Sequence, residues 1–210
     1  MLLYLVRHAQ SRANADVACR DVDCELTDLG SQQAELVAAE LASQTFFQVL
    51  ASPYRRAVAT GREIAAAAGA SLALLPIAHE HHGSAPVGWI PPSRAELIWR
   101  YPDLPLIGDV PETTWHQLPE TYELVATRMR AALATLRSHY GSAERVLLVS
   151  HASPIQQLIG VATGGYTPLE ATRLAIGNAS LTVLDLASAP ARLEVLGRCE
   201  FLNVAEPVLR

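Results

Sequence analysis

The stretch Leu2-Leu3-Tyr4-Leu5-Val6-Arg7-His8 decides the fold, because a five-residue apolar run ends in an arginine and a histidine. The apolar run predicts a buried strand over residues 2–6. A second apolar run, Val146-Leu147-Leu148-Val149, ends in the same way at Ser150-His151. Open α/β sheets bind their ligands at the carboxyl ends of the strands. The sequence therefore predicts one site that contains both histidines.

Further strands and helices alternate along the chain. Strands are expected at 46–50, 72–75, 180–186 and 193–199, and helices at 32–41, 53–68, 93–100, 119–139 and 153–162. Ser52-Pro53 is typical of an N-cap followed by proline at the first helical position, which predicts where the second helix begins. The alternation predicts a three-layer α/β/α sandwich, in which helices flank a mostly parallel sheet.

The length of 210 residues suits one sizeable core. Residues 84–119 differ in composition, since they hold seven of the thirteen prolines and show no long periodic pattern. We interpret them as an ordered Pro-rich insertion over the active-site edge of the sheet. A single domain over residues 1–210 is therefore expected.

Composition disfavours several classes of partner. The net charge is −5, 50% of the residues are hydrophobic and no Lys/Arg run stands out, which disfavours nucleic-acid binding. The apolar runs fall short of the ~20 residues that a membrane span needs, and no secretory signal is visible. The three cysteines are expected to be free thiols in a reducing cytoplasm. The oligomeric state stays open, with a homodimer as one option.

The predicted strand ends supply residues suited to an anion: Arg7, His8, Asn14, Ser52, Arg56 and His151. Guanidinium groups match a phosphoryl group bidentately, and a helix N-terminus after His151 would add backbone N–H groups. An imidazole among them can attack phosphorus and form a phosphohistidine. These residues point to phosphoryl transfer, which needs little beyond positioning, charge stabilisation and a proton donor.

Four blocks in this order resemble the histidine phosphatase superfamily, which has the phosphoglycerate mutase-like fold. They are Arg7-His8-Ala9-Gln10-Ser11-Arg12-Ala13-Asn14, Leu26-Thr27-Asp28-Leu29-Gly30-Ser31-Gln32-Gln33-Ala34, Ala51-Ser52-Pro53-Tyr54-Arg55-Arg56-Ala57-Val58-Ala59-Thr60 and Val149-Ser150-His151-Ala152. Ala9 and Ala152 stand where glycine is more common in that family.

The resemblance implies a role for each matching residue. His8 would be the nucleophile, and the phosphoryl oxygens would be held by Arg7, Asn14, Arg56, His151 and Ala152. Glu80 would be the proton donor, with another carboxylate near the site as the alternative. No cofactor and no metal are expected.

Two clusters of potential metal ligands offer an alternative interpretation, a metal site. His79, His81 and His82 are too close in sequence for the i, i+4 spacing that places two ligands on one helix face. The loop with Cys19, Cys24 and three aspartates is interpreted as a solvated acidic loop.

The expected function is a metal-independent phosphomonoesterase that hydrolyses a small phosphate ester through a phosphohistidine. A phosphoglycerate mutase is the first alternative, although the sequence offers few extra cations for a doubly phosphorylated intermediate. A catalytically silent phosphate-binding protein is the second alternative, because the methyl groups of Ala9 and Ala152 could crowd the phosphate.

Overall fold

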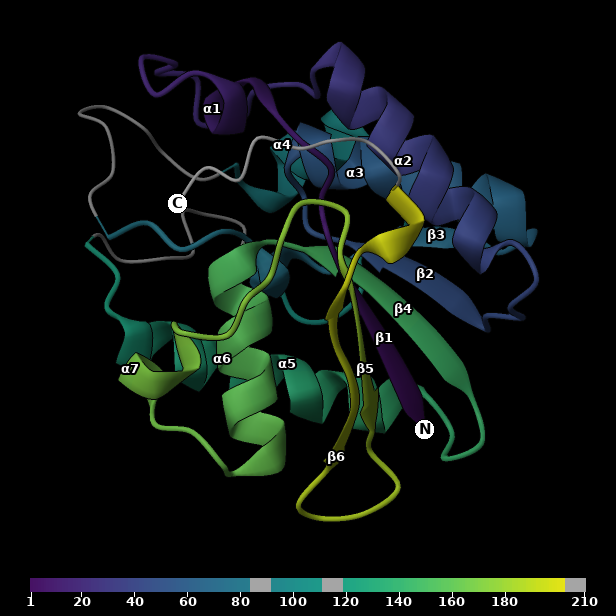
Figure 1. Ribbon diagram of the computed structural model, residues 1–210, viewed down its shortest axis with the longest axis vertical. Coiled ribbons are helices and arrows are strands. Elements are labelled where there is room, and N and C mark those ends of the chain that lie inside the picture. The colour runs from purple at the N-terminus through teal and green to yellow at the C-terminus, as the bar shows by residue number, and fades with distance from the viewer. Residues whose placement is uncertain (84–91, 111–118, 203–210) are drawn as a thin grey trace.

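A six-stranded sheet organises the molecule (Figure 1). The computed structural model describes residues 1–83, 92–110 and 119–202. The strand order is β3-β2-β4-β1-β5-β6. The strands are β1 (Leu2–Arg7), β2 (Gln48–Ala51), β3 (Leu72–Leu74), β4 (Arg145–Ser150), β5 (Leu181–Asp185) and β6 (Arg192–Arg198). The pairings among β1 to β4 are parallel, whereas β5 is antiparallel to both β1 and β6. The predicted mostly parallel sheet is confirmed.

Helices cover both faces of the sheet, as Figure 1 shows. The long helices are α2 (Asp28–Leu41), α3 (Arg55–Ala68), α5 (Tyr122–His139) and α6 (Ala152–Thr163). The short ones are α1 (Arg12–Ala15), α4 (Arg94–Arg100), α7 (Pro168–Ala171), and the 3₁₀ turns η1 (Pro76–Ala78) and η2 (Glu200–Leu202).

The buried strand β4 alternates between two cores. Val146 and Leu148 pack in the cluster that includes α5 and α6, whereas Leu147 and Val149 pack in the cluster with α2 and α3. Successive side chains of a strand point to opposite faces, so each face of β4 needs its own helical layer. The three-layer sandwich is confirmed.

Helix α2 lies directly against the segment that follows β1. Its N-cap Thr27 accepts a hydrogen bond from the Gly30 N–H at 3.0 Å, and the Thr27 N–H donates to the Gln10 carbonyl at 3.0 Å. A Cβ atom at Gly30 would overlap that same carbonyl oxygen. The second sequence block thus folds onto the first because the first turn of this helix contains a glycine that allows close approach.

Helix α3 begins later than predicted, at Arg55 with Tyr54 as its N-cap. Ser52 does not cap the helix, because its backbone N–H donates to the Val149 carbonyl and its hydroxyl lies 2.7 Å from His151 Nε2. The prediction of a Ser52-Pro53 start is therefore wrong. The carboxylate of Asp23 instead accepts the Arg55 N–H at 2.7 Å.

The Pro-rich insertion is described only over residues 92–110, and residues 84–91 and 111–118 lie outside the described part. Its chain runs beside the edge strand β3: Leu74 N–H donates to Pro105 O and Ile107 N–H donates to Leu74 O, both at 2.8 Å. Across the described ranges, no helix combines the length and the apolar character that crossing a bilayer requires.

Candidate active site

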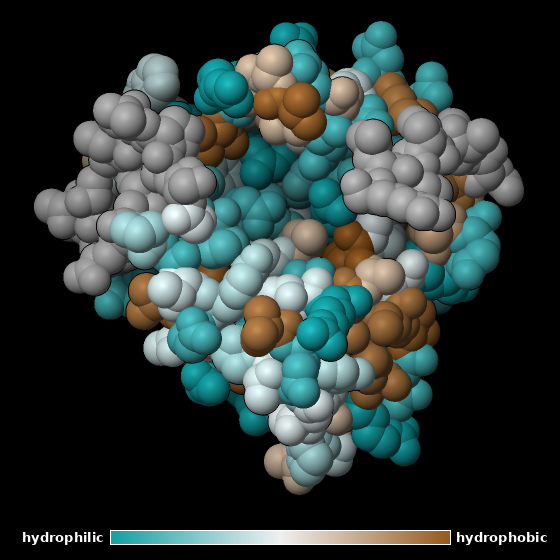
Figure 2. Space-filling model, turned by 60° about the vertical axis from the view of Figure 1, so that its left-hand side comes forward, coloured by the Kyte–Doolittle hydropathy of each residue, from teal (hydrophilic) through white to brown (hydrophobic). Residues whose placement is uncertain are grey.

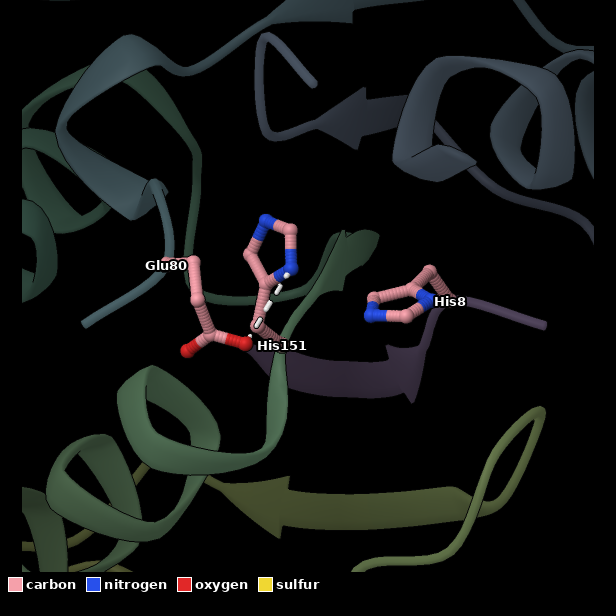
Figure 3. A group of neighbouring side chains, drawn as sticks. All are labelled: His8, Glu80 and His151. Atoms are coloured by element: carbon pink, nitrogen blue, oxygen red, sulfur yellow. Dashed lines mark ion pairs between the residues drawn. The ribbon is translucent and has the colours of Figure 1, made fainter. Parts of the chain in front are cut away.

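Both predicted histidines lie at the carboxyl edge of the sheet, where β1 and β4 end side by side. Arg7 pairs with Ser150 in the strand register, and the His8 N–H donates to the Ser150 carbonyl at 2.9 Å. The two imidazole rings that follow are 5.0 Å apart between centroids. Figure 3 shows that His8, Glu80 and His151 converge from three segments of the chain.

The orientation of the His8 ring is determined by its own neighbour. His8 Nδ1 lies 2.7 Å from the Ala9 carbonyl, and because a carbonyl oxygen can only accept, Nδ1 carries the proton. Nε2 therefore has the lone pair, and Arg56 Nε donates to it at 3.2 Å. Burial, then the charges of Arg56 and Arg7, lower the pKa of His8 well below its ordinary value. The ring is neutral, with its lone pair facing the site.

Arg56 is the buried cation at the centre of the site. Besides His8, its guanidinium reaches the Val22 carbonyl at 2.8 Å and lies 3.4 Å from His151 Nδ1. It also lies over the ring of Tyr54, 4.8 Å from the centroid. The side chain extends from the first turn of α3, so the start of that helix sets its position.

His151 is fully buried and its ring is held at both nitrogens. Nε2 lies 2.7 Å from the Ser52 hydroxyl, which can donate or accept, and Nδ1 lies 3.5 Å from a carboxylate oxygen of Glu80. Burial and the nearby Arg56 lower the pKa of His151 well below its ordinary value. His151 is also the N-cap residue of α6, so Ala152 is the first residue of that helix.

Glu80 stands on the opposite side of His151 from His8 (Figure 3). One of its oxygens accepts the His81 N–H at 2.8 Å, and the other faces His151. Its side chain is 25% exposed, so it borders the solvent where His8 and His151 do not. A carboxyl group in this position can exchange a proton with water or with a leaving group.

Arg7 and Asn14 are held by residues near β5. Arg7 Nη1 donates to the Ile176 carbonyl at 2.8 Å. Asn178 Nδ2 donates to both the His8 carbonyl at 3.0 Å and Asn14 Oδ1 at 3.2 Å. Asn14 Oδ1 also accepts hydrogen bonds from the N–H and the hydroxyl of Ser11, and these contacts fix which end of the Asn14 amide is the oxygen and which is the donor nitrogen. Sequence reasoning missed Asn178, since no motif or strand end marks it.

The two unusual alanines contribute their methyl groups to the cores. Ala9 is fully buried in the cluster with α2 and α3, and its N–H donates to the Thr60 hydroxyl at 3.1 Å. Ala152 packs against the cluster with α5 and α6.

One side of the molecule is hollowed (Figure 2). Figure 2 brings forward the side toward which β1 and β4 run in Figure 1. The depth of the hollow is mainly hydrophilic. This colouring agrees with a site built from arginine, histidine and glutamate.

The only group of potential metal ligands among the described residues is His8, Glu80 and His151, whose ligand atoms lie within 4.8 Å of one another. Arg56 directs N–H groups at the lone pair of His8 Nε2 and toward His151 Nδ1. A permanent cation in that place favours an anion over a metal ion.

The metal alternatives from the sequence do not form sites. The rings of His79, His81 and His82 face three different partners: the Glu80 carbonyl, the Glu120 carbonyl and the Tyr54 hydroxyl. The acidic loop is not merely solvated, however, because Asp23 has a side chain only 15% exposed and receives Arg100 at 2.5 Å.

Two neutral imidazoles, a buried guanidinium and a solvent-bordering carboxyl at the strand ends of an α/β sheet define an enzyme that handles phosphoryl groups. A family model described as the histidine phosphatase superfamily (branch 1) matches residues 3–198. The chain belongs to this superfamily, and it is an enzyme of the histidine phosphatase class.

Two related protein sequences align with most of the chain. It is 31% identical over 193 residues to a probable phosphoglycerate mutase GpmB of Photorhabdus laumondii, a match that covers 90% of this chain and 86% of the relative. It is 29% identical over 169 residues to a putative phosphoserine phosphatase 2 of Hydrogenobacter thermophilus, covering 77% and 78% of the two chains.

Solved structures share the fold. A mycobacterial glucosyl-3-phosphoglycerate phosphatase superimposes with a TM-score of 0.69 at 24% identity, covering 94% of this chain and 99% of its own. A phosphoserine phosphatase of Entamoeba histolytica gives 0.72 at 20% identity, covering 96% and 98%.

Proposed function

We propose that this chain is a phosphomonoesterase that acts through a phosphohistidine at His8 and needs no metal ion. The observation that carries the proposal is the state of the His8 ring. Its Nδ1 proton is held by the Ala9 carbonyl, so a neutral Nε2 lone pair faces Arg56 and the site. A neutral, oriented imidazole beside permanent cations is what nucleophilic attack on a phosphate ester requires.

In the first step, His8 Nε2 attacks phosphorus while the bond to the ester oxygen breaks. Arg7, Arg56, His151, the Asn14 amide and the backbone at Ala152 would hold the phosphoryl oxygens. Glu80 would give its proton to the leaving oxygen, which departs as an alcohol. In the second step, Glu80 would take a proton from water, which attacks phosphorus, breaks the P–N bond and releases inorganic phosphate.

A mutase reaction is the second candidate, because a relative over 90% of the chain is named a probable phosphoglycerate mutase. Retaining a doubly phosphorylated intermediate needs cations that remain available. The arginines beside the acidic loop are already in ion pairs: Arg55 with Asp21, Asp23 and Glu25, and Arg100 with Asp23. This pairing favours hydrolysis over the mutase reaction.

A silent phosphate-binding protein is disfavoured by the positions of Ala9 and Ala152. The hypothesis of a silent protein requires the methyl groups of Ala9 and Ala152 to crowd the phosphate. Ala9 is instead buried in one core, and Ala152 packs, partly buried, against the other.

The substrate is proposed to be a small phosphorylated molecule, as the names of the relatives and structural neighbours suggest. Three free cysteines support a cytoplasmic location, because thiols remain reduced there.

The test is to quench the reaction with a phosphate ester and search for a phosphoryl group on the peptide containing His8. We expect it in the wild type and, in greater amount, in Glu80→Gln, which should release it slowly. His8→Ala should show neither the adduct nor turnover. Turnover by a folded His8→Ala variant would remove the phosphohistidine mechanism. Incubation with 3-phosphoglycerate followed by ³¹P NMR separates hydrolysis from isomerisation.

A further inference from the structure

The segment that carries Glu80 is held in place by Glu120, which precedes α5, and by Arg128, which lies in the second turn of that helix. Residues 79–83 form neither helix nor strand, so their backbone lacks the regular hydrogen bonds that position the other site residues. A proton donor must nevertheless stand within hydrogen-bond reach of the leaving oxygen. Something outside the segment must therefore define where Glu80 lies.

Arg128 makes the required contacts. Its Nη1 donates to the Ile77 carbonyl at 2.9 Å and its Nη2 donates to the Glu80 carbonyl at 3.3 Å. The same guanidinium binds Glu120 through both carboxylate oxygens, at 2.6 Å and 3.1 Å. Both side chains are nearly buried, at 11% and 5% exposed. A bidentate, buried pair has a fixed geometry, which a flexible surface pair lacks.

Glu120 holds the far end of the same segment. Its backbone N–H donates to the His82 carbonyl at 2.9 Å, and its carbonyl lies 2.8 Å from His81 Nε2. The Glu120–Arg128 pair therefore contacts the segment on both sides of Glu80.

The charge of the pair also suits a proton donor. Arg128 reaches the backbone carbonyl of Glu80 and not its carboxylate, and its own charge is balanced by Glu120. A direct ion pair with the carboxylate would favour the ionised form and oppose proton donation. Contact through the backbone provides position without that effect.

We propose that Arg128, fixed by Glu120, is the positioning residue for Glu80 in leaving-group protonation. The inference rests on the proposed function, in which Glu80 is the proton donor. Neither Arg128 nor Glu120 touches the phosphoryl group in this mechanism.

The experiment compares two substrates, an alkyl phosphate and p-nitrophenyl phosphate. An alkoxide needs a proton to leave, whereas nitrophenolate departs without one. Arg128→Lys keeps the charge but loses the fork that joins Ile77, Glu80 and Glu120. A displacement of about 1 Å can cost roughly 10²-fold in rate, so we expect kcat for the alkyl phosphate to fall at least about tenfold. The nitrophenyl ester should lose much less. Arg130→Lys, the same change at an exposed position of α5, is the matched control and should leave both rates unchanged.

The double variant separates positioning from general destabilisation. In a Glu80→Gln background, Arg128→Lys should add little further loss with the alkyl phosphate, because the proton donor is already absent. Equal losses on both substrates, or additive losses in the double variant, would overturn the inference. If Arg128→Lys does not fold, Glu120→Gln tests the same pair while keeping the backbone contacts of residue 120, and the same substrate-selective loss is expected.

The same variants distinguish a failure of the proposed function from a failure of the positioning inference. If Glu80→Gln itself shows no selective loss, the assignment of Glu80 as proton donor is wrong. If Glu80→Gln is selective and the folded pair variants are not, Glu80 acts without the help of Arg128, and the positioning inference alone fails.

Discussion

Arg56 contacts both histidines of the proposed phosphoryl site, and its guanidinium geometry is what makes this possible. Nε faces His8, one terminal nitrogen binds the Val22 carbonyl and the other faces His151. An ammonium group carries the same charge but cannot direct parallel N–H groups at two oxygens.

Arg56→Lys should therefore reduce kcat/KM by about 10²-fold or more, the loss typical of removing one transition-state donor. Arg55→Lys is the control. Arg55 is next to Arg56 in the sequence, but its own side chain is 45% exposed and pairs with loop carboxylates. Steady-state kinetics of both variants with one phosphate ester make the comparison. Near-normal kinetics for Arg56→Lys would make that guanidinium peripheral.

Metal removal tests the same residues in another way. Arg56 donates toward the nitrogen atoms that would ligate a cation at His8 and His151, so the site should work on arginine and histidine alone. We expect dialysis against EDTA to leave turnover unchanged. Activity that is lost on chelation and restored by one defined metal ion would contradict this expectation.

Individual residues were predictable from the sequence where they directly follow a strand. His8 and His151 come together because adjacent parallel strands end at the same edge. Asn178, Arg128 and Glu120 were not predictable, since their contacts join residues far apart in the sequence or use backbone carbonyls that no motif marks.

At the scale of elements, the start of α3 depends on a residue from a distant loop. Asp23 accepts the first N–H of the helix and receives Arg100, and the adjacent Val22 carbonyl binds Arg56. The loop therefore caps the helix and orients Arg56 at the same time.

Asp23→Ala should remove a helix cap worth about 1 kcal/mol. For a protein of this size, that loss lowers the melting temperature by about 2–4 °C. Weaker inhibition by inorganic phosphate should accompany it, because Val22 would no longer hold Arg56. Asp21→Ala, at a side chain 56% exposed and 3.7 Å from Arg55, should change neither quantity. Unaltered phosphate inhibition in Asp23→Ala would show that the loop is not needed to orient Arg56.

A different contact, between Ser52 and His151, explains why the predicted helix start was wrong. Ser52-Pro53 has the local pattern of a cap, but the buried hydroxyl of Ser52 binds His151. A tertiary hydrogen bond thus took precedence over a local preference. The antiparallel direction of β5 could not be predicted from the sequence either, because the pattern of apolar residues does not encode strand direction.

The stability of the whole molecule should depend on the two buried histidines. Burial and Arg56 lower the pKa of both His8 and His151 in the folded state. Above pH 6.5 both rings are neutral in the folded and unfolded chains. As the pH falls below that value, only the unfolded chain takes up these protons, so the free energy of unfolding decreases.

Each histidine should lower stability by up to about 1.4 kcal/mol per pH unit until its folded-state pKa is reached. Thermal unfolding between pH 7 and pH 5 measures the slope. His8→Asn should unfold with a shallower dependence on pH, whereas His139→Asn, at an exposed position, should keep the wild-type slope. Parallel slopes for the wild type and His8→Asn would contradict the neutral state of His8 in the folded chain.

The position of β1 between β4 and β5 has a consequence for the order in which the protein is made. The strand that leads to His8 leaves the ribosome before its two neighbours in the sheet, which are residues 145–150 and 181–185. Until the ribosome has added both, the site lacks the backbone partner of His8 at Ser150 and the contacts from Ile176 and Asn178 that hold Arg7 and Asn14. If His8 is the nucleophile, as proposed, a nascent chain that ends before these strands cannot assemble the site, and catalytic competence requires residues up to 185.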